Sequence, residues 1–238
     1  MDAVLYALPA SHPCAAVERA LVLKGIPYRR VELIPGAHRI AMRLRFGERT
    51  VPAVAFPDGG RVVGSRPLMR ALDARVPEPR LVRGGADAAR AEEWGDEVLQ
   101  PLTRRVVWAA LVRAPEHVMP YTEDAELPVP RRLASATAPL TARLAARLND
   151  AGDANVRADL LALPGHLDRI DRWIGEGLLP AGPPSAAALQ IAASVGLLRT
   201  VGDVRALIDA RPAGGLARAL FPDYPGDVPA GALPRDWL

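Results

Sequence analysis

Residues 3–14 read AVLYALPASHPC, and the run from Ala15 to Lys24 that follows is amphipathic with a helical period. The apolar first part predicts a β-strand, and the second run predicts an α-helix. Where a strand leads directly into a helix, the N–H groups of the first turn lack partners and the positive end of the helix dipole is exposed. That position favours an anion such as a thiolate, and Ser11 stands where the anion would be held.

Strand and helix patterns continue to residue 76. They predict strands at 3–8, 28–33, 53–57 and 61–64, and helices at 14–25, 37–46 and 66–75. The first two strands should be parallel because a helix joins them, whereas Asp58-Gly59-Gly60 predicts a tight antiparallel hairpin between the last two. The first part of the chain is therefore an α/β domain, a βαβ unit followed by a ββα unit.

A turn-rich passage, Val76 to Gly85, then interrupts the periodicity, and no strand pattern follows it. We predict a domain at 1–77, a linker at 78–85 and an all-helical domain at 86–238. Helices are expected at 86–114, 131–151, 155–176, 185–199, 201–211 and 213–220. Pro101 should kink the first of these and Pro164-Gly165 should break the third. The acidic residues of the first helix should form a mostly solvated face; they are Glu92, Glu93, Asp96 and Glu97.

The composition excludes several classes of function. The net charge is +3, basic residues are scattered among acids and aromatic residues make up 5%, so nucleic acid is not an expected partner. The single cysteine excludes an internal disulfide, and the absence of an export signal predicts a cytoplasmic protein. Polar residues interrupt the alanine-rich stretches, which fall short of the roughly 20 apolar residues of a membrane span, so no membrane partner is expected. The four histidines lack metal-ligand spacing, so no metal site is expected.

The segment Ser11-His12-Pro13-Cys14 has the form of a dithiol site in which a hydroxyl replaces the first sulfur. A dithiol–disulfide cycle within the protein is therefore impossible. The Ser11 hydroxyl can instead donate a hydrogen bond to a bound thiol and lower its pKa, which would be the catalytic act. Helix capping by Ser11 is the alternative, and these four residues do not decide between the two. Cys14 fits a small buried hydrophobe, with a mixed disulfide to a thiol substrate as the other option, and His12 is expected to be exposed.

Val51-Pro52 opens the third predicted strand. Proline has no N–H to donate, and an X-Pro bond adopts the cis form at modest cost. We expect a cis bond here, with the Val51 N–H and C=O free to pair with a peptide-like ligand as an added strand. An ordinary strand-opening proline is the alternative. Val51, Ser11 and Ser65 should meet at one end of the sheet.

These segments together resemble bacterial glutathione S-transferases, which combine a thioredoxin-like N-terminal domain with a helical bundle. In that family a Val-Pro pair holds the cysteinyl backbone of glutathione, and an acidic or amide residue followed by serine binds its γ-glutamyl end. In this sequence Gly64 stands in place of the acidic or amide residue. The resemblance implies a glutathione site formed by Ser11, Val51, Pro52, Ser65 and Arg66.

The same resemblance implies a small electrophilic second substrate bound against the helical domain. The candidate residues for its pocket are Trp94, Val98, Arg105 and Tyr121. It also implies a homodimer through helices 66–75 and 86–114, where Leu68, Leu72 and Trp108 supply apolar surface.

The function indicated is therefore transfer of a thiol, glutathione or a similar one, to an unidentified electrophile, as in detoxification. Glutathione would be a co-substrate, and no other cofactor is implied. Ser11 and Cys14 are the catalytic candidates. Two alternatives stay open: a non-catalytic binding or regulatory module, favoured by Gly64, and a thiol-dependent disulfide reductase that uses an exposed Cys14.

Overall fold

The computed structural model describes residues 2–123, 125–126 and 129–237. Its sheet has four strands in the order β2-β1-β3-β4. Strand β1 pairs parallel with β2 and antiparallel with β3, which in turn pairs antiparallel with β4. The predicted mixture of parallel and antiparallel neighbours is confirmed. The strands are β1 (Ala3–Ala7), β2 (Tyr28–Glu32), β3 (Ala53–Ala55) and β4 (Arg61–Val63).

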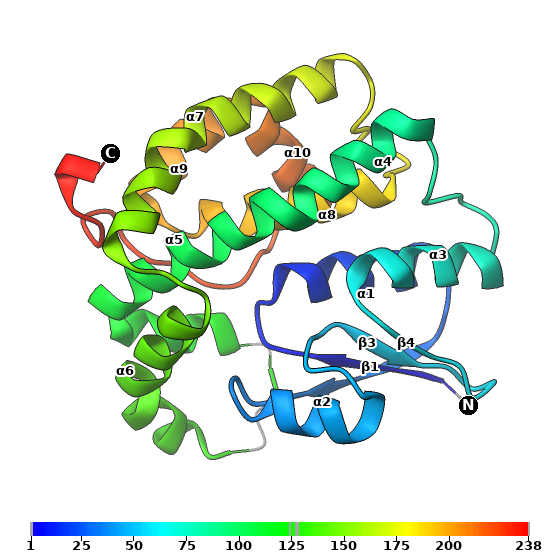
Figure 1. Cartoon of the computed structure of the whole chain (residues 1–238), viewed down its shortest axis with the longest axis horizontal. Helices are drawn as coiled ribbons and strands as arrows, with labels where there is room; N and C mark the ends of the chain where they lie inside the picture. Colours follow the sequence, from blue (N-terminus) through cyan, green and yellow to red (C-terminus); the bar gives the residue numbers. More distant parts are fainter. Residues whose placement is uncertain (1, 124, 127–128, 238) are drawn as a thin grey trace.

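Helices cover both faces of this sheet (Figure 1). Helix α2 (His38–Phe46) lies on one face, where its Met42 packs with Tyr6 and Ala53. Helices α1 (His12–Leu23) and α3 (Ser65–Arg75) lie on the other face, between the sheet and the helical part of the chain. The crossover through α1 is what makes β1 and β2 parallel.

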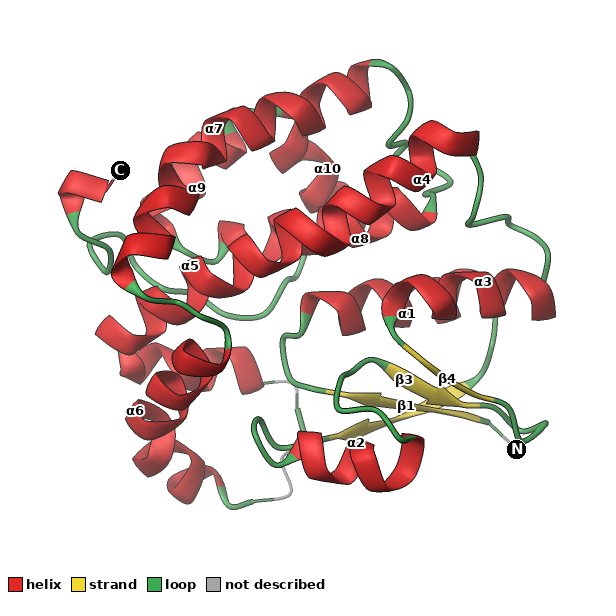
Figure 2. Ribbon diagram, in the orientation of Figure 1, coloured by secondary structure: helices red, strands yellow, loops and turns green. Residues whose placement is uncertain are grey.

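Beyond α3 the described regular structure is helical apart from one isolated bridge, Val201 to Val228, as Figure 2 shows. Helix α8 runs through the centre of this part, and its residues from Ala186 to Leu198 are all buried. The fold is therefore a thioredoxin-like α/β domain followed by a helical bundle. The helices are α4 (Gly85–Trp94), α5 (Gln100–Arg113), α6 (Arg131–Leu148), α7 (Asp153–Gly175), α8 (Ala186–Arg199), α9 (Gly202–Asp209) and α10 (Pro212–Leu220), with a π-helical segment at Gly95–Leu99 and 3-10 segments at Pro115–Thr122 and Arg235–Trp237.

The two prolines expected to interrupt helices differ in their outcome. Pro101 lies in the first turn of α5, immediately after the π-helical segment, whose wider turn accommodates a residue without an N–H. The predicted break at Pro164-Gly165 is wrong, because α7 is continuous from Asp153 to Gly175. Pro164 is on the exposed side of α7, and Leu163 and Leu167 beside it are buried in the core. Packing of that apolar face holds the helix together despite the missing hydrogen bond.

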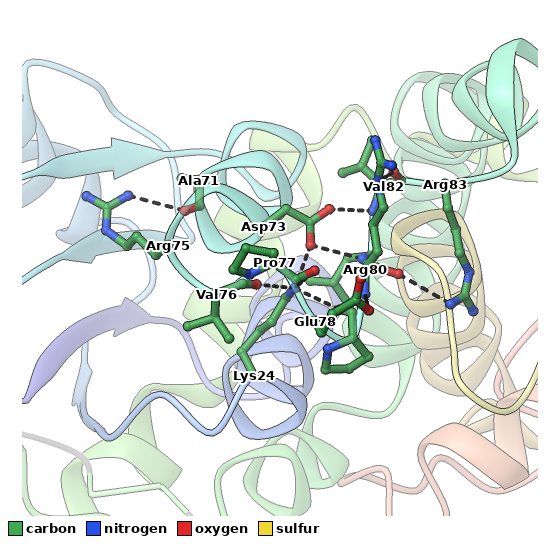
Figure 3. A network of polar contacts seen from close by, with 12 residues as sticks. Lys24, Ala71, Asp73, Arg75, Val76, Pro77, Glu78, Arg80, Val82 and Arg83 are labelled. Carbon is green, nitrogen blue, oxygen red and sulfur yellow. Dashed lines mark hydrogen bonds and ion pairs between the residues drawn. The ribbon is translucent and has the colours of Figure 1, made fainter.

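Lys24, the only lysine of the chain, ties α1 to the connection between α3 and α4 (Figure 3). Its ammonium group donates to the carbonyls of Val76 (2.6 Å) and Pro79 (2.7 Å) and pairs with Asp73 at 2.6 Å. The Asp73 carboxylate also accepts from the backbone N–H groups of Leu81 and Val82. This network fixes the path of the chain from the sheet to the helices.

Two of the apolar residues expected to be available for a dimer are not at the surface. Leu68 and Leu72 are fully buried within the chain, where α3 packs against α1 and the sheet. Trp108 is half-buried. The amphipathic face of α3 is used inside one chain, so these two leucines cannot contribute to contact with a second copy.

Candidate functional site

Ser11 lies at the N-terminus of α1 with an extended backbone (φ −73°, ψ 113°). Its carbonyl accepts the first helical hydrogen bond, from Ala15, but its side chain makes no capping bond. The Ser11 side chain therefore does not cap the helix, and its hydroxyl lies at the positive end of the α1 dipole. Ser11 lines a cavity of about 540 Å³, which Tyr121, Phe221 and Tyr224 also line.

A group of charged side chains forms one wall of this cavity. Arg30 donates to the carboxylates of Glu32 (2.6 Å) and Glu18, and Glu18 accepts from Tyr28 as well (2.9 Å). Burial raises the pKa of Glu32, against the opposing effect of Arg30. On another wall the Tyr224 hydroxyl donates to the carbonyl of Ala10 at 3.0 Å, which links the C-terminal segment to the loop that carries Ser11.

Cys14 is fully buried in the first turn of α1. Burial raises the pKa of its thiol to about 11, although the Ser11 hydroxyl and the backbone of Leu8 act in the opposite direction. A thiol with this pKa is protonated at neutral pH and is a poor nucleophile. The structure therefore favours the interpretation of Cys14 as a small hydrophobe of the core.

His12 is buried, with 2% of its surface exposed, and the expectation of an exposed histidine is wrong. Its Nδ1 lies 2.9 Å from the Ser194 hydroxyl, which donates its own hydrogen to the carbonyl of Gln190. The Nδ1 of His12 is thus the donor. Burial lowers the pKa of His12 well below 6.5, and Arg104 adds to the effect. The imidazole is neutral because the N-terminus of α1 packs directly on α8.

The Val51-Pro52 peptide bond is cis, as the sequence predicts. The Pro52 carbonyl accepts from the N–H of Gly64 at 2.8 Å. Within the described part of the chain, no backbone hydrogen bond outside the strands engages Val51. Its N–H and C=O precede β3 and can pair with an extended ligand.

Ser65 and Arg66 begin α3, but they present different groups from those expected. The Ser65 side chain is buried, and its hydroxyl donates to Gln190 Oε1 at 2.9 Å. What Ser65 can offer a ligand is the N–H of the first helical turn. The Arg66 guanidinium is partly exposed and lies 4.0 Å from Glu93. Gly64 has a φ of +93° and a Cβ there would approach Pro67 Cδ to 3.3 Å, so a side chain at this position would be strained.

The partner of Ser65 belongs to a buried network that sequence analysis missed. Gln190 Nε2 donates to Glu92 at 2.7 Å. Arg70 donates two hydrogen bonds, of 3.1 and 2.8 Å, to the Glu92 carboxylate. Glu92 is therefore buried, not part of a solvated acidic face, since α4 turns it toward α3 and α8. The available signal was Gln190 and Ser194, two polar residues in an otherwise apolar helix.

The four residues proposed for the second pocket do not meet. Trp94 packs edge-on against Trp173 of α7, with ring centroids 5.2 Å apart, and lines a separate cavity of about 460 Å³. Arg105 forms two hydrogen bonds with Asp159 of α7 (2.6 and 2.8 Å). Val98 is on the exposed side of the π-helical segment. Only Tyr121 shares the cavity of Ser11, and its hydroxyl lies 2.6 Å from that of Thr200. Among the described residues, no cluster of three or more His, Cys, Asp or Glu side chains is suited to hold a metal ion.

Comparison with known proteins gives one family and many similar folds. Residues 5–80 match the family described as the N-terminal domain of glutathione S-transferase. No curated protein sequence matches the chain. A glutathione S-transferase from Rhodospirillum rubrum F11 superposes with a TM-score of 0.60 at 21% identity, covering 99% of this chain and 97% of that one.

Two further solved structures show the same architecture. A glutathione S-transferase from Methylobacterium radiotolerans JCM 2831, in complex with glutathione sulfonate, has a TM-score of 0.55 at 18% identity, over 96% of this chain and 95% of that one. Glutathione transferase F7 from Populus trichocarpa has a TM-score of 0.63 at 16% identity, over 91% and 92%. At these identities the likeness establishes the fold.

Proposed function

Because residues 5–80 match the N-terminal domain of glutathione S-transferase, we propose that the chain is a member of that family and that Ser11 activates a bound small thiol for attack on an electrophile. The observation that carries the proposal is the Ser11 hydroxyl, which caps no helix, stands at the positive end of α1 and lines a cavity of about 540 Å³. A thiolate at this position gains from both the dipole and the hydroxyl.

The thiol, glutathione or a close analogue, would lie along the cis Val51-Pro52 segment and pair with the Val51 backbone. Its carboxylate end would meet the N–H groups of the first turn of α3 and the Arg66 guanidinium. The electrophile would occupy the cavity beside Ser11, between Tyr121 and the segment Phe221 to Tyr224. With a chloronitrobenzene, the thiolate sulfur forms a bond to the ring carbon, the carbon–chlorine bond breaks, chloride leaves, and the thiol proton goes to water.

A non-catalytic binding module is the second candidate, because the Ser65 hydroxyl is engaged with Gln190 and Gly64 supplies no side chain. The disulfide reductase is less well supported, since the Cys14 thiol is buried and protonated. A homodimer, a role in detoxification and a cytoplasmic location remain predictions. Light scattering at micromolar concentration tests the first of these.

The Ser11→Ala variant separates the enzyme from the module. We expect about a hundredfold lower kcat with glutathione and a chloronitrobenzene, because a hydrogen bond that forms mainly with the ionised sulfur acts on reactivity. Thiol affinity measured by calorimetry should change little. The pH profile of kcat should move to higher pH, since the bound thiol loses the group that lowers its pKa.

The control is Cys14→Ala, which should leave the rate nearly unchanged. A conservative Ser11→Thr variant should keep part of the activity. Wild-type protein that binds glutathione but accelerates no conjugation would favour the binding module. Loss of activity in Cys14→Ala but not in Ser11→Ala would favour the reductase.

A further inference from the structure

The outer face of α6 presents a row of leucines to solvent. Leu133, Leu140 and Leu144 are separated by seven and four residues, so they lie on one side of the helix. All three are exposed, Leu140 to 69%. The opposite side of α6 packs on the protein through small residues, Ala138, Ala142 and Ala145. The larger apolar side chains of this helix thus point away from the core.

Helix α2 extends this apolar surface. Ile40 and Leu44 are on the side of α2 that faces away from its buried Met42, and Leu44 is 83% exposed. A β-carbon at Gly36, in the loop that leads into α2, would lie only 3.8 Å from Leu144 Cδ2. Figure 1 shows the two helices at the same end of the molecule. We call Leu133, Leu140, Leu144, Ile40 and Leu44 the α6–α2 face.

The charged side chains of the two helices that form the α6–α2 face have one sign. Neither α2 nor α6 contains an acidic residue. Seven exposed arginines lie on these two helices, and in the part of the chain that the structure describes none of them pairs with a carboxylate. They are Arg39, Arg43, Arg45, Arg131, Arg132, Arg143 and Arg147. The surface therefore combines aliphatic side chains with uncompensated positive charge.

Exposed aliphatic side chains together with positive charge favour one kind of binding partner for the α6–α2 face over the others. A second copy placed symmetrically on the face would bring fourteen arginines together, which like-charge repulsion opposes. Protein interfaces concentrate their energy in aromatic anchors seated in pockets, and this face has neither aromatic residues nor a described cavity. Protruding aliphatic side chains flanked by arginines fit the boundary between headgroups and acyl chains of an anionic bilayer.

We propose that the α6–α2 face docks the protein on an anionic lipid surface, with its leucines and isoleucine in the acyl boundary and its arginines at the phosphates. The expectation of no membrane partner came from spanning segments alone. No helix within the described ranges is long and apolar enough to cross a bilayer, so the association is peripheral. The segment before α6 carries Tyr121, which lines the cavity of Ser11. Docking would bring that cavity close to apolar molecules dissolved in the membrane.

Vesicle sedimentation tests the proposal with the full chain. Wild-type protein should bind vesicles of about 30% phosphatidylglycerol in phosphatidylcholine, should not bind phosphatidylcholine alone, and should dissociate as salt rises. The Leu140→Ser/Leu144→Ser variant should bind about tenfold more weakly, because its apolar insertion is lost. The matched control is Leu161→Ser, a 71% exposed leucine on α7, which should bind like wild type.

A charge variant gives a second, independent readout. Arg143→Glu/Arg147→Glu should lose binding to anionic vesicles, whereas Arg157→Glu on the exposed side of α7 should keep most of it. These positions are all exposed, so the variants should fold, as circular dichroism checks. Absence of binding to anionic vesicles, or equal binding by the leucine variant and its control, overturns the proposal. Equal retention on soluble polyglutamate, or self-association that the leucine variant abolishes, would assign the face to an acidic protein or to a second copy.

Discussion

The two ends of helix α1 are built in opposite ways. At its C-terminal end the Lys24 ammonium is fully buried and bonded to Val76, Pro79 and Asp73. At its N-terminal end the Ser11 hydroxyl makes no capping hydrogen bond, and the Nε2 atom of His12 is buried without a partner among the described residues. Helix α5, whose Arg104 is close enough to lower the pKa of His12, adds two more buried polar atoms, in Gln100 and Thr103, for which the described part of the chain supplies no hydrogen-bond partner.

The difference separates a structural role from a chemical one. A buried polar group with all its partners holds a single arrangement, whereas one without partners costs free energy that the rest of the fold must offset. Departures from complete hydrogen bonding are expected where a protein binds or transforms a ligand. The C-terminal end of α1 therefore fixes the helix, and its N-terminal end is the place where chemistry is expected.

The largest expected effect is at Lys24. Removing one partner of a buried ion pair leaves the other charge and its acceptors unpaired, so Lys24→Met should lower the free energy of unfolding by about 3 kcal/mol. Urea denaturation measures it. The matched control is Arg90→Met, which breaks an exposed pair with Asp87 and should change stability by less than about 0.5 kcal/mol. Equal stability of the two variants would show that the Lys24 network is not what holds the linker.

A smaller change in the free energy of unfolding is expected at acidic pH, through Asp73. Burial acts against the charge of Asp73, but hydrogen bonds from Lys24, Leu81 and Val82 hold the pKa of its carboxyl below the usual 3.8. Because the folded pKa lies below the unfolded one, Asp73 contributes stability above about pH 4, and this is lost as pH falls through the folded pKa.

The variant Asp73→Asn should therefore be less stable than wild type at pH 7, with a smaller difference at pH 3. Denaturation curves at the two pH values measure it. The control Asp87→Asn, with an exposed carboxylate, should follow wild type at both. A difference between Asp73→Asn and wild type that does not depend on pH would mean that packing, and not charge, carries the role of Asp73.

Local patterns were sufficient to predict the N-terminal fold. Hydrophobic periodicity, the turn at Asp58-Gly59-Gly60 and the proline after Val51 are each decided by neighbouring residues, and the corresponding elements form where they were expected. The helices of the second part follow from the same periodicity. The wrong break at Pro164 shows the limit of this approach, because the packing of Leu163 and Leu167 outweighs the local preference of proline.

The site was less predictable because its side chains depend on contacts distant in sequence. His12 is buried by Ser194, and the Ser65 hydroxyl is taken by Gln190, 125 positions further along the chain. Glu92 is buried for the same reason. A single sequence shows that α8 carries Gln190 and Ser194 among apolar residues, but not which surface they meet. The prediction of the second pocket was wrong for the same reason, because Trp94 and Arg105 pack on α7, which is distant in sequence.

The smallest expected change in stability, at Thr103, gives the most direct test of the contrast between the two ends of α1. Thr103 is fully buried, and its hydroxyl has no partner within residues 2–123, 125–126 and 129–237, so the isosteric Thr103→Val removes an unpaired polar group and should stabilise the protein by about 1 kcal/mol. Thr200 is the matched control, because its buried hydroxyl bonds both Tyr121 and the Leu197 carbonyl. The same substitution at Thr200 should destabilise by a similar amount. Thermal melts of the two variants should thus move in opposite directions. If both lose stability, the Thr103 hydroxyl is already satisfied in solution, and incomplete hydrogen bonding would no longer distinguish the N-terminal end of α1 as a place for ligand chemistry.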